Sequence, residues 1–341
     1  MEKRILIIGY FGYKTNQLDG QTIKTRNIYN LLVKNYRYVD FFDSQSIKKE
    51  FFQLIYKVIK NDYLIYLPGS NNLTYIFPLI FILSKIRRSK IIYPVVGGWL
   101  DLFLKKHPFH LFLLRNIYAI LSESSNLDNN LINNFNLKNT SILPNFRDNC
   151  YLTPPNNKSS FNIVFMARIC EEKGINVVFR FAEYIIKHNL VNPQYPIKIT
   201  FYGNLDSLQD HQSFFSNIKK FPFITYEGIV NPEDVYSKLI DQDILVLPTH
   251  YSGEGLPGSI IEAYIAGIPV VVSNWRFLPE FVEHGETGYI YDLDKEEDFY
   301  SFILYLYNNA DKLSYMKNKA KIRGYKYTSE YALEILKKYI I

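Results

Sequence analysis

The chain has 341 residues, of which 48% are hydrophobic and 21% are charged. This composition excludes a disordered chain and supplies enough apolar side chains for two cores, and the length favours two domains over one. The two cysteines, Cys150 and Cys170, fit neither the spacing of a metal site nor a disulfide framework. We therefore expect a protein of a reducing compartment.

The net charge is divided unevenly along the chain. Residues 1–150 carry 20 Lys and Arg against 10 Asp and Glu, or +10, whereas residues 151–341 carry 19 against 23, or −4. Basic segments at residues 83–90 and 104–110 stand beside aromatic side chains, which favours contact with an anionic membrane surface over ordinary solvated faces. We expect no nucleic-acid partner, because the sequence has no helix-turn-helix, zinc-finger or RNP signature.

No segment of the sequence is expected to cross a membrane. The apolar run near the start, residues 5–8, is too short for a signal peptide. The longest apolar stretch, residues 75–83, contains Pro78 and falls well short of the roughly twenty residues that span a bilayer. We expect a cytoplasmic protein that is peripheral to the inner face of the cytoplasmic membrane.

Strand-like runs alternate with helical ones in the first half of the chain, which favours a parallel α/β sheet. A glycine-bearing loop, residues 9–22, follows the first strand and leads into a helix with Ile28, Leu31 and Leu32 on one face. The expected strands are residues 5–8, 63–67 and 91–96.

A linker with two prolines and no periodicity is expected at residues 151–160. Parallel α/β sheets bind ligands beyond the carboxyl ends of their strands, so the loops after the strands are the candidate sites. Beyond the linker the expected strands are residues 163–166, 197–202, 244–247 and 270–272, and the last expected helix spans residues 331–340.

Two cations follow the first strand of the second half. Within FNIVFMARICEEKGIN, residues 161–176, the apolar run ends at Arg168, and Lys173 stands just before a turn closed by a glycine. A guanidinium and an ammonium together can bind oxygens of two phosphates. The alternative is a solvated turn in which Glu171 and Glu172 pair with these cations.

Two glutamates flank a glycine-rich turn in EGLPGSIIEAYIAGIP, residues 254–269. Gly258 or Ser259 is expected to cap a helix that ends at Gly267, which places Glu262 in the first turn. Amides at a helix N-terminus favour a diphosphate, and a carboxylate matches a ribose diol. The alternative is a structural turn that opens a helix with one favourable acid.

The two segments complement each other, because cations for a diphosphate and acids for a ribose are two halves of one site. Two D-x-D sequences, at residues 241–243 and 292–294, have the form that holds a divalent metal on nucleotide sugars in some enzymes. The first opens an expected strand and the second lies in a polar loop, so we expect no metal. His250 and His284 are interpreted as loop residues.

The order of these motifs resembles that of the retaining glycosyltransferases of family 4, enzymes of the GT-B architecture. The motifs are a glycine-bearing N-terminal loop, L-P-N before the linker, A-R-x4-K-G, and E-x7-E followed by A-G-x-P. The resemblance spans nearly the whole chain and implies two Rossmann-like α/β domains whose parallel sheets face each other across a cleft. It implies an acceptor-binding domain at residues 1–150, a nucleotide-sugar-binding domain at 161–325, and a terminal helix at 326–341 that crosses back to the first domain.

The resemblance also implies roles for individual residues. Arg168, Lys173 and Glu254 would form the catalytic group, in which the two cations hold the donor diphosphate and Glu254 contacts the donor sugar. Glu262 would bind the ribose hydroxyls. The further donor-binding residues that the resemblance implies are Gly20, Gln21, Gly203, Gly255, Leu256, Pro257, Gly258 and Ser259.

The first half departs from the family pattern in two places. Only one glycine of the usual pair at the first helix, Gly20, is present, and Gly97 stands where many members carry a histidine after the third expected strand. Trp99 is interpreted as a packing residue or as a platform for a sugar ring. The acceptor-side candidates are therefore Gly97, Gly98, Trp99 and Asp101.

The resemblance implies a retaining, metal-independent transfer of a sugar from a nucleoside diphosphate, with UDP favoured, to a hydroxyl of a lipid-linked glycan. The product would be a cell-surface polysaccharide such as capsule or O-antigen. Two alternatives remain, a non-catalytic GT-B accessory subunit of another transferase and a nucleotide-sugar epimerase. An activity test with and without an acceptor separates them.

Overall fold

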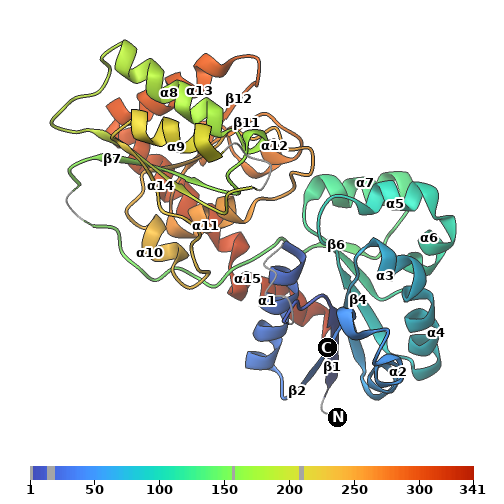
Figure 1. Ribbon diagram of the computed structural model, residues 1–341. Helices are drawn as coiled ribbons and strands as arrows, with labels where there is room; N and C mark the ends of the chain where they lie inside the picture. Colours follow the sequence, from blue (N-terminus) through green and yellow to red (C-terminus); the bar gives the residue numbers. More distant parts are fainter. Residues whose placement is uncertain (1–2, 14–19, 156–157, 207–210) are drawn as a thin grey trace. The chain divides into compact units, whose positions relative to one another are not determined.

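A computed structural model describes residues 3–13, 20–155, 158–206 and 211–341. The chain forms two compact units, shown in Figure 1. The first unit is Met1–Asp148 together with Thr328–Ile341, and the second is Asn149–Tyr327. The sequence analysis predicted boundaries at 150 and at 325.

The first unit is built on a six-stranded parallel sheet with the strand order β2-β1-β3-β4-β5-β6. Its strands are β1 (Arg4–Gly9), β2 (Tyr38–Asp43), β3 (Tyr63–Leu67), β4 (Lys90–Pro94), β5 (Ala119–Ser122) and β6 (Thr140–Ile142). Its helices are α1 (Gly20–Asn35), α2 (Phe51–Lys60), α3 (Ser70–Tyr75), α4 (Phe77–Arg87), α5 (Leu100–Lys106), α6 (Pro108–Arg115), α7 (Ser125–Phe135) and α15 (Ser329–Tyr339).

Two apolar cores cover the two faces of this sheet. Alternate residues of β1 point to opposite faces, as a strand requires. Leu6 and Ile8 pack with α2, α4, α6 and α7, whereas Ile5 and Ile7 pack with α1 and α15. The last helix therefore belongs to the first unit, where Ile335 and Leu336 of α15 are buried.

The second unit has a six-stranded parallel sheet with the order β12-β11-β10-β7-β8-β9. One continuous core surrounds it. Its strands are β7 (Phe161–Met166), β8 (Ile197–Tyr202), β9 (Ile224–Tyr226), β10 (Ile244–Leu247), β11 (Val270–Ser273) and β12 (Gly288–Tyr291). Its helices are α8 (Ile175–Lys187), α9 (His211–Lys220), α10 (Val235–Leu239), α11 (Gly258–Ala266), α12 (Leu278–Phe281), α13 (Glu296–Asn308) and α14 (Ala310–Gly324).

Each sheet has one point at which the strand order reverses. In the first unit this point lies between β1 and β3, and in the second between β7 and β10. Successive connections run in opposite directions from such a point, so the loops after the two central strands separate and leave a crevice at the carboxyl edge of the sheet. The candidate ligand-binding loops are therefore those after β7 and β10 in the second unit, and those after β1 and β3 in the first.

The sequence-based prediction of parallel α/β sheets is confirmed. The structure contains every expected strand within two residues at each end, including Tyr63–Leu67, Ile197–Tyr202 and Ile244–Leu247 with unchanged bounds. None of the helices in the described part of the chain combines the length and the apolar character that crossing a bilayer requires.

Candidate functional site

The first element of the site is the turn that follows β7. Arg168 lies two residues after the strand, and its guanidinium pairs with Asp206, with 3.0 Å between Nη1 and Oδ2. The guanidinium carbon also lies 5.0 Å from the centre of the Tyr251 ring, in a cation–π contact. The Arg168 side chain is 41% exposed, so a bound anion can reach it.

The turn after β7 packs directly against the end of β10, and a glycine makes this approach feasible. Gly174 has a φ of +87°, and a Cβ atom there would lie 2.1 Å from the carbonyl oxygen of Pro248. Two hydrogen bonds to the Glu172 carbonyl fix the contact, one from the His250 amide at 2.8 Å and one from the Thr249 hydroxyl at 3.1 Å. The loops on both sides of the reversal point are thus held together.

This contact brings together Lys173 and Glu254, which are 81 positions apart. The ammonium donates to the carboxylate at 2.6 Å, and the Thr249 hydroxyl donates to the same oxygen at 2.9 Å. Both side chains are nearly buried. The Lys173 ammonium also lies 4.8 Å from the centre of the Tyr251 ring, so one aromatic ring lies beneath both cations.

The predicted alternative, in which Glu171 and Glu172 neutralise the two cations, is wrong. Arg168 pairs with Asp206 and Lys173 pairs with Glu254. Glu171 and Glu172 lie in a short 3-10 helix with Lys173 and are exposed, whereas the partners come from the loops after the neighbouring strands β8 and β10.

The second element of the site is the N-terminus of α11. The predicted caps, Gly258 and Ser259, are wrong, because the helix is capped by Pro257, which has extended backbone angles and no side-chain cap bond. Glu262 is the fifth helical residue, so it lies in the second turn and not in the predicted first turn. The expected end at Gly267 is confirmed by its left-handed conformation, with φ at +78°.

The α11 terminus keeps the property on which the donor prediction depends. The first amides of a helix have no acceptor within the helix, and here they belong to Gly258 and Ser259. The segment before them is glycine-bearing and half-buried, and a Cβ atom on Gly255 would meet nothing within 4 Å. Leu256 packs on the core of the second unit. A ligand can therefore come close to this backbone.

Gly203, a predicted donor-binding residue, has a structural reason for being glycine. It follows β8 with a φ of +146°, and a Cβ atom would lie 1.7 Å from the Ala167 carbonyl oxygen. No other residue fits there without moving the backbone beside Arg168. Its contact with a donor stays a prediction.

In the first unit, Gly20 and Gln21 form the start of α1, at the reversal point of that sheet. The Gln21 side-chain amide donates to the Leu67 carbonyl at the end of β3, at 3.2 Å. Much of the loop that precedes them, residues 14–19, lies outside the described residues.

The loop after β4 carries the acceptor-side candidates, and a buried ion pair supports it. Gly97 has a φ of +75°, and its amide donates to Glu123 at 2.9 Å. The other oxygen of Glu123 accepts from Lys24 at 2.8 Å. Lys24 is fully buried in α1, and this loss of hydration lowers the pKa of its ammonium while Glu123 opposes the shift.

The side chains of the other acceptor-side candidates are partly engaged in the fold. Trp99 packs edge-on against Phe103, with ring centres 5.7 Å apart, and joins the core under α5. This is the packing interpretation of Trp99. Asp101 accepts a hydrogen bond from the Leu102 amide, and Gly98 is half-buried beside them.

The residues that sequence reasoning missed are the partners of the predicted ones, chiefly Asp206, Thr249, Tyr251, Lys24 and Glu123. The burial of Lys24 could have been predicted from the sequence, because this residue stands one helical turn before Ile28 on the apolar face of the first helix. The others lie in loops, where only the tertiary fold brings them to the site.

Two of the D-x-D carboxylates, Asp243 and Asp292, have well-defined structural partners. Asp243 is buried and pairs with Lys317 at 2.6 Å and with Lys158 at 3.0 Å. Asp292 accepts from Asn274 and Lys295. His284 accepts from the Ile290 amide, and His250 lies in the loop after β10.

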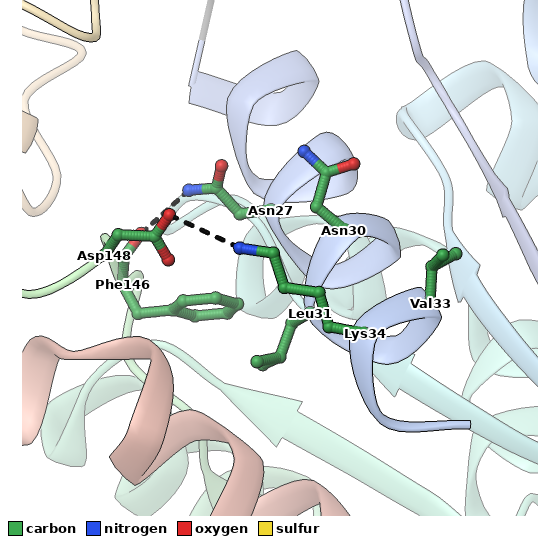
Figure 2. A pocket seen from close by; sticks show the side chains of 7 residues that line it. All are labelled: Asn27, Asn30, Leu31, Val33, Lys34, Phe146 and Asp148. Atoms are coloured by element: carbon green, nitrogen blue, oxygen red, sulfur yellow. Dashed lines mark hydrogen bonds and ion pairs between the residues drawn. The ribbon is translucent and has the colours of Figure 1, made fainter.

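A separate pocket of about 230 Å³ lies beside α1 in the first unit. Figure 2 shows Asn27 donating to the Phe146 carbonyl and Lys34 pairing with Asp148. None of the predicted site residues lines it. These contacts tie the end of the first segment of this unit to α1.

Comparison with known proteins identifies the family. Residues 153–323, half of the chain, match the family described as Glycosyl transferases group 1. The chain belongs to this family. The group 1 match contains the predicted donor-site residues of the second unit.

Two curated relatives have informative descriptions. An uncharacterized 41.2 kDa protein in the cps region of Klebsiella pneumoniae is 28% identical over 137 residues, which is 40% of this chain and 34% of that protein. The Escherichia coli UDP-Gal:alpha-D-GlcNAc-diphosphoundecaprenol alpha-1,3-galactosyltransferase is 26% identical over 144 residues, covering 42% and 35%. The chain thus matches about a third of the length of these two relatives.

Among solved structures, HepE of Anabaena in complex with UDP superposes with a TM-score of 0.73 at 16% identity, covering 98% of both chains. The predicted GT-B fold is confirmed.

Proposed function

We propose that this group 1 protein is a retaining glycosyltransferase of family 4, which transfers a sugar from a UDP-sugar to a hydroxyl of a lipid-linked glycan. The observation that carries the proposal is the contact between the loops after β7 and β10. It places Arg168, Lys173 and Glu254 together at the reversal point of the second sheet, where a doubly wound fold binds nucleotides.

The two cations and the N-terminus of α11 can stabilise the negative charge of the leaving diphosphate. As the bond from the anomeric carbon to the phosphate oxygen breaks, negative charge accumulates on the diphosphate. Arg168, Lys173 and the first amides of α11 offset this charge without a metal ion. Glu254 accepts hydrogen bonds from hydroxyls of the donor sugar, and Glu262 accepts from the ribose.

Lys173 can serve Glu254 and a phosphate at the same time. An ammonium has three N–H donors, and among the described residues Glu254 is the only hydrogen-bond acceptor of Lys173. The remaining donors can bind a phosphate oxygen without breaking the ion pair. The pair would then connect the sugar end of the donor to its diphosphate.

In the proposed reaction the acceptor oxygen bonds to the anomeric carbon from the face that the diphosphate leaves, so the configuration is retained. The departing phosphate oxygen takes the acceptor proton, and no separate side-chain base is required. This fits a site in which both cations are already paired, Arg168 with Asp206 and Lys173 with Glu254.

Relatives support the choice of substrates. The E. coli relative is named for a UDP-Gal donor and a diphosphoundecaprenol acceptor, and the Klebsiella relative is encoded in a cps region. HepE was solved with UDP. We therefore propose a UDP-sugar donor and an acceptor in the synthesis of a surface polysaccharide.

A thermal-shift titration with UDP, GDP, ADP and dTDP, with and without Mg²⁺, tests the donor site. We expect one nucleotide, UDP, to raise the melting temperature without the metal. Arg168→Ala should abolish this shift and lower turnover more than about tenfold, or about 1.4 kcal/mol in the barrier. Arg180→Ala is the matched control, because Arg180 is 52% exposed and pairs with Glu296 in the same unit.

Two outcomes would contradict the proposal. The absence of any response to the four nucleotides would favour the accessory-subunit alternative. Conversion of the donor to an isomeric sugar nucleotide without an acceptor would favour the epimerase.

A further inference from the structure

Three helices of the first unit, α2, α4 and α6, cover the same face of its sheet. Figure 1 shows them along one side of the strands. Their inner sides supply buried residues to a single core, including Val58 of α2, Ile80 of α4 and Leu114 of α6. Because a helix buries only one side in such a layer, the outer sides of the three helices form one continuous surface, which we call the outer face.

The outer face is unusually apolar. Phe52 is 84% exposed and Ile86 is 77% exposed. These side chains recur at helical spacing, on the side of each helix opposite the buried residues. They therefore form a stripe and are not scattered over the surface. The exposed apolar residues on the three helices are Phe51, Phe52, Tyr56, Ile59, Ile82, Ile86, Phe109 and Phe112.

The charges on these helices have one sign. The 10 residues of α2, 11 of α4 and 8 of α6 contain five Lys and Arg and no Asp or Glu. Two of the bases have acidic partners on neighbouring segments, Lys57 with Asp40 and Arg87 with Asp62. The other three, Lys60, Lys85 and Arg115, form no ion pair among the described residues, although Lys85 donates to the Asn116 carbonyl and Arg115 to the Phe135 carbonyl.

A basic pocket of about 410 Å³ lies at the C-terminal end of α4. Lys85, Arg88 and Lys90 line it together with polar groups such as Ser89, and no acidic side chain is among its lining residues. Lys90 lies 4.4 Å from the centre of the Tyr118 ring, which holds its ammonium at the pocket wall. The pocket therefore gathers three basic side chains at the end of the same helix that carries the exposed Ile82 and Ile86.

We propose that the outer face docks on an anionic lipid bilayer, with the exposed Phe and Ile side chains entering the interface and the Lys and Arg side chains binding headgroup phosphates. Apolar tips among basic residues match the two layers of a membrane surface. This docking does not depend on the proposed transfer reaction, and it would bring the protein to a lipid-linked acceptor.

Charge complementarity favours a bilayer over a second copy of the chain. Pairing two outer faces would oppose like charges, which costs free energy. A bilayer rich in phosphatidylglycerol supplies the opposite sign and an apolar layer together.

Vesicle flotation at low salt tests the proposal. We expect the full chain to bind phosphatidylglycerol vesicles and not phosphatidylcholine vesicles. Ile82→Glu with Ile86→Glu should lower partition to phosphatidylglycerol by about tenfold or more. Lys85→Glu with Arg88→Glu should also release the protein.

The matched control is Ile186→Glu with Ile322→Glu, since these side chains are 54% and 64% exposed on α8 and α14 of the second unit. The control should float as the unmodified protein does. Melting temperature and the UDP-induced shift, measured on each variant, separate lost docking from lost folding or a failed donor site.

Equal loss in the control, or no binding of the unmodified protein to phosphatidylglycerol, would overturn the proposal. A dimer in sedimentation experiments that disappears in the Ile82 and Ile86 variant would identify the face as a contact between copies instead.

Discussion

In each unit a lysine ammonium pairs with a glutamate near the carboxyl edge of the sheet. The two lysines differ in how many hydrogen-bond acceptors surround the ammonium. Lys24 in the first unit donates to Glu123 and Val95 at 2.8 Å each, with Leu143 at 3.5 Å as a third acceptor. Lys173 in the second unit has Glu254 as its one acceptor among the described residues.

This difference separates a positioning lysine from one available to a ligand. An ammonium with three acceptors has no donor left, and Lys24 is fully buried. Its role is to hold α1, the end of β4 and the Gly97 loop in one arrangement. Lys173 keeps donors free beside a partly exposed arginine, so it can bind phosphate. The comparison predicts that one lysine matters for stability and the other for turnover.

The largest effect is expected for Lys24→Met. Removing one partner of a buried ion pair leaves Glu123 uncompensated and lowers the free energy of unfolding by about 3–5 kcal/mol. Fluorescence of Trp99 during urea unfolding, in a Trp275→Phe background, reports on the first unit alone.

Lys34→Met is the control for that measurement, because Lys34 lies on the same helix with its side chain 67% exposed. Adding Glu123→Leu to Lys24→Met should restore part of the lost stability. Equal destabilisation by the Lys24 and Lys34 changes would show that Lys24 is not a positioning residue.

Lys173→Met is expected to raise the activation free energy of the reaction, by less than Lys24→Met lowers the free energy of unfolding. Loss of a cation on the leaving diphosphate should lower kcat by about 100-fold, or about 2.7 kcal/mol. Steady-state kinetics at saturating donor measure this. Lys220→Met serves as the control, since Lys220 is 56% exposed and pairs with Glu183 in the same unit. Turnover within twofold of the unmodified protein would exclude Lys173 from the site.

The smallest effect is expected for Glu262→Ala, which should weaken UDP binding by about tenfold, or about 1.4 kcal/mol. The ribose contact predicts that the variant no longer distinguishes UDP from 2′-deoxy-UDP in calorimetry. Glu297→Ala, an exposed change on α13, should leave both affinities unchanged. Undiminished discrimination by the Glu262 variant would place the ribose elsewhere.

The sequence predicted the buried strands because their apolar runs are long enough to stand out. It missed β2, β5, β6, β9 and β12 for physical reasons. β6 and β9 have only three residues each, β2 has two aspartates among its six residues, and β5 and β12 begin with Ala119 and Gly288, which have low strand propensity. Strands this short carry little periodicity, and neighbouring strands determine whether they pair.

The site was predicted as two separate motifs, one of cations and one of acids. What the sequence could not supply was that Lys173 and Glu254 are each other's partners, because that depends on Gly174 fitting against the Pro248 carbonyl. It also placed the start of α11 one or two residues too late, since Pro257 caps the helix without a side-chain bond. Contacts between loops distant in the chain are determined by the sheet topology.

The return of α15 to the first unit has a consequence for synthesis on the ribosome. Ile5 and Ile7 lie in the core that Ile335 and Leu336 complete. The first unit therefore cannot close this side of its sheet until residues 329–339 have left the exit tunnel, whereas the second unit is one uninterrupted segment. The part translated first is thus completed last, and the apolar side chains that α15 covers stay exposed while the rest is translated.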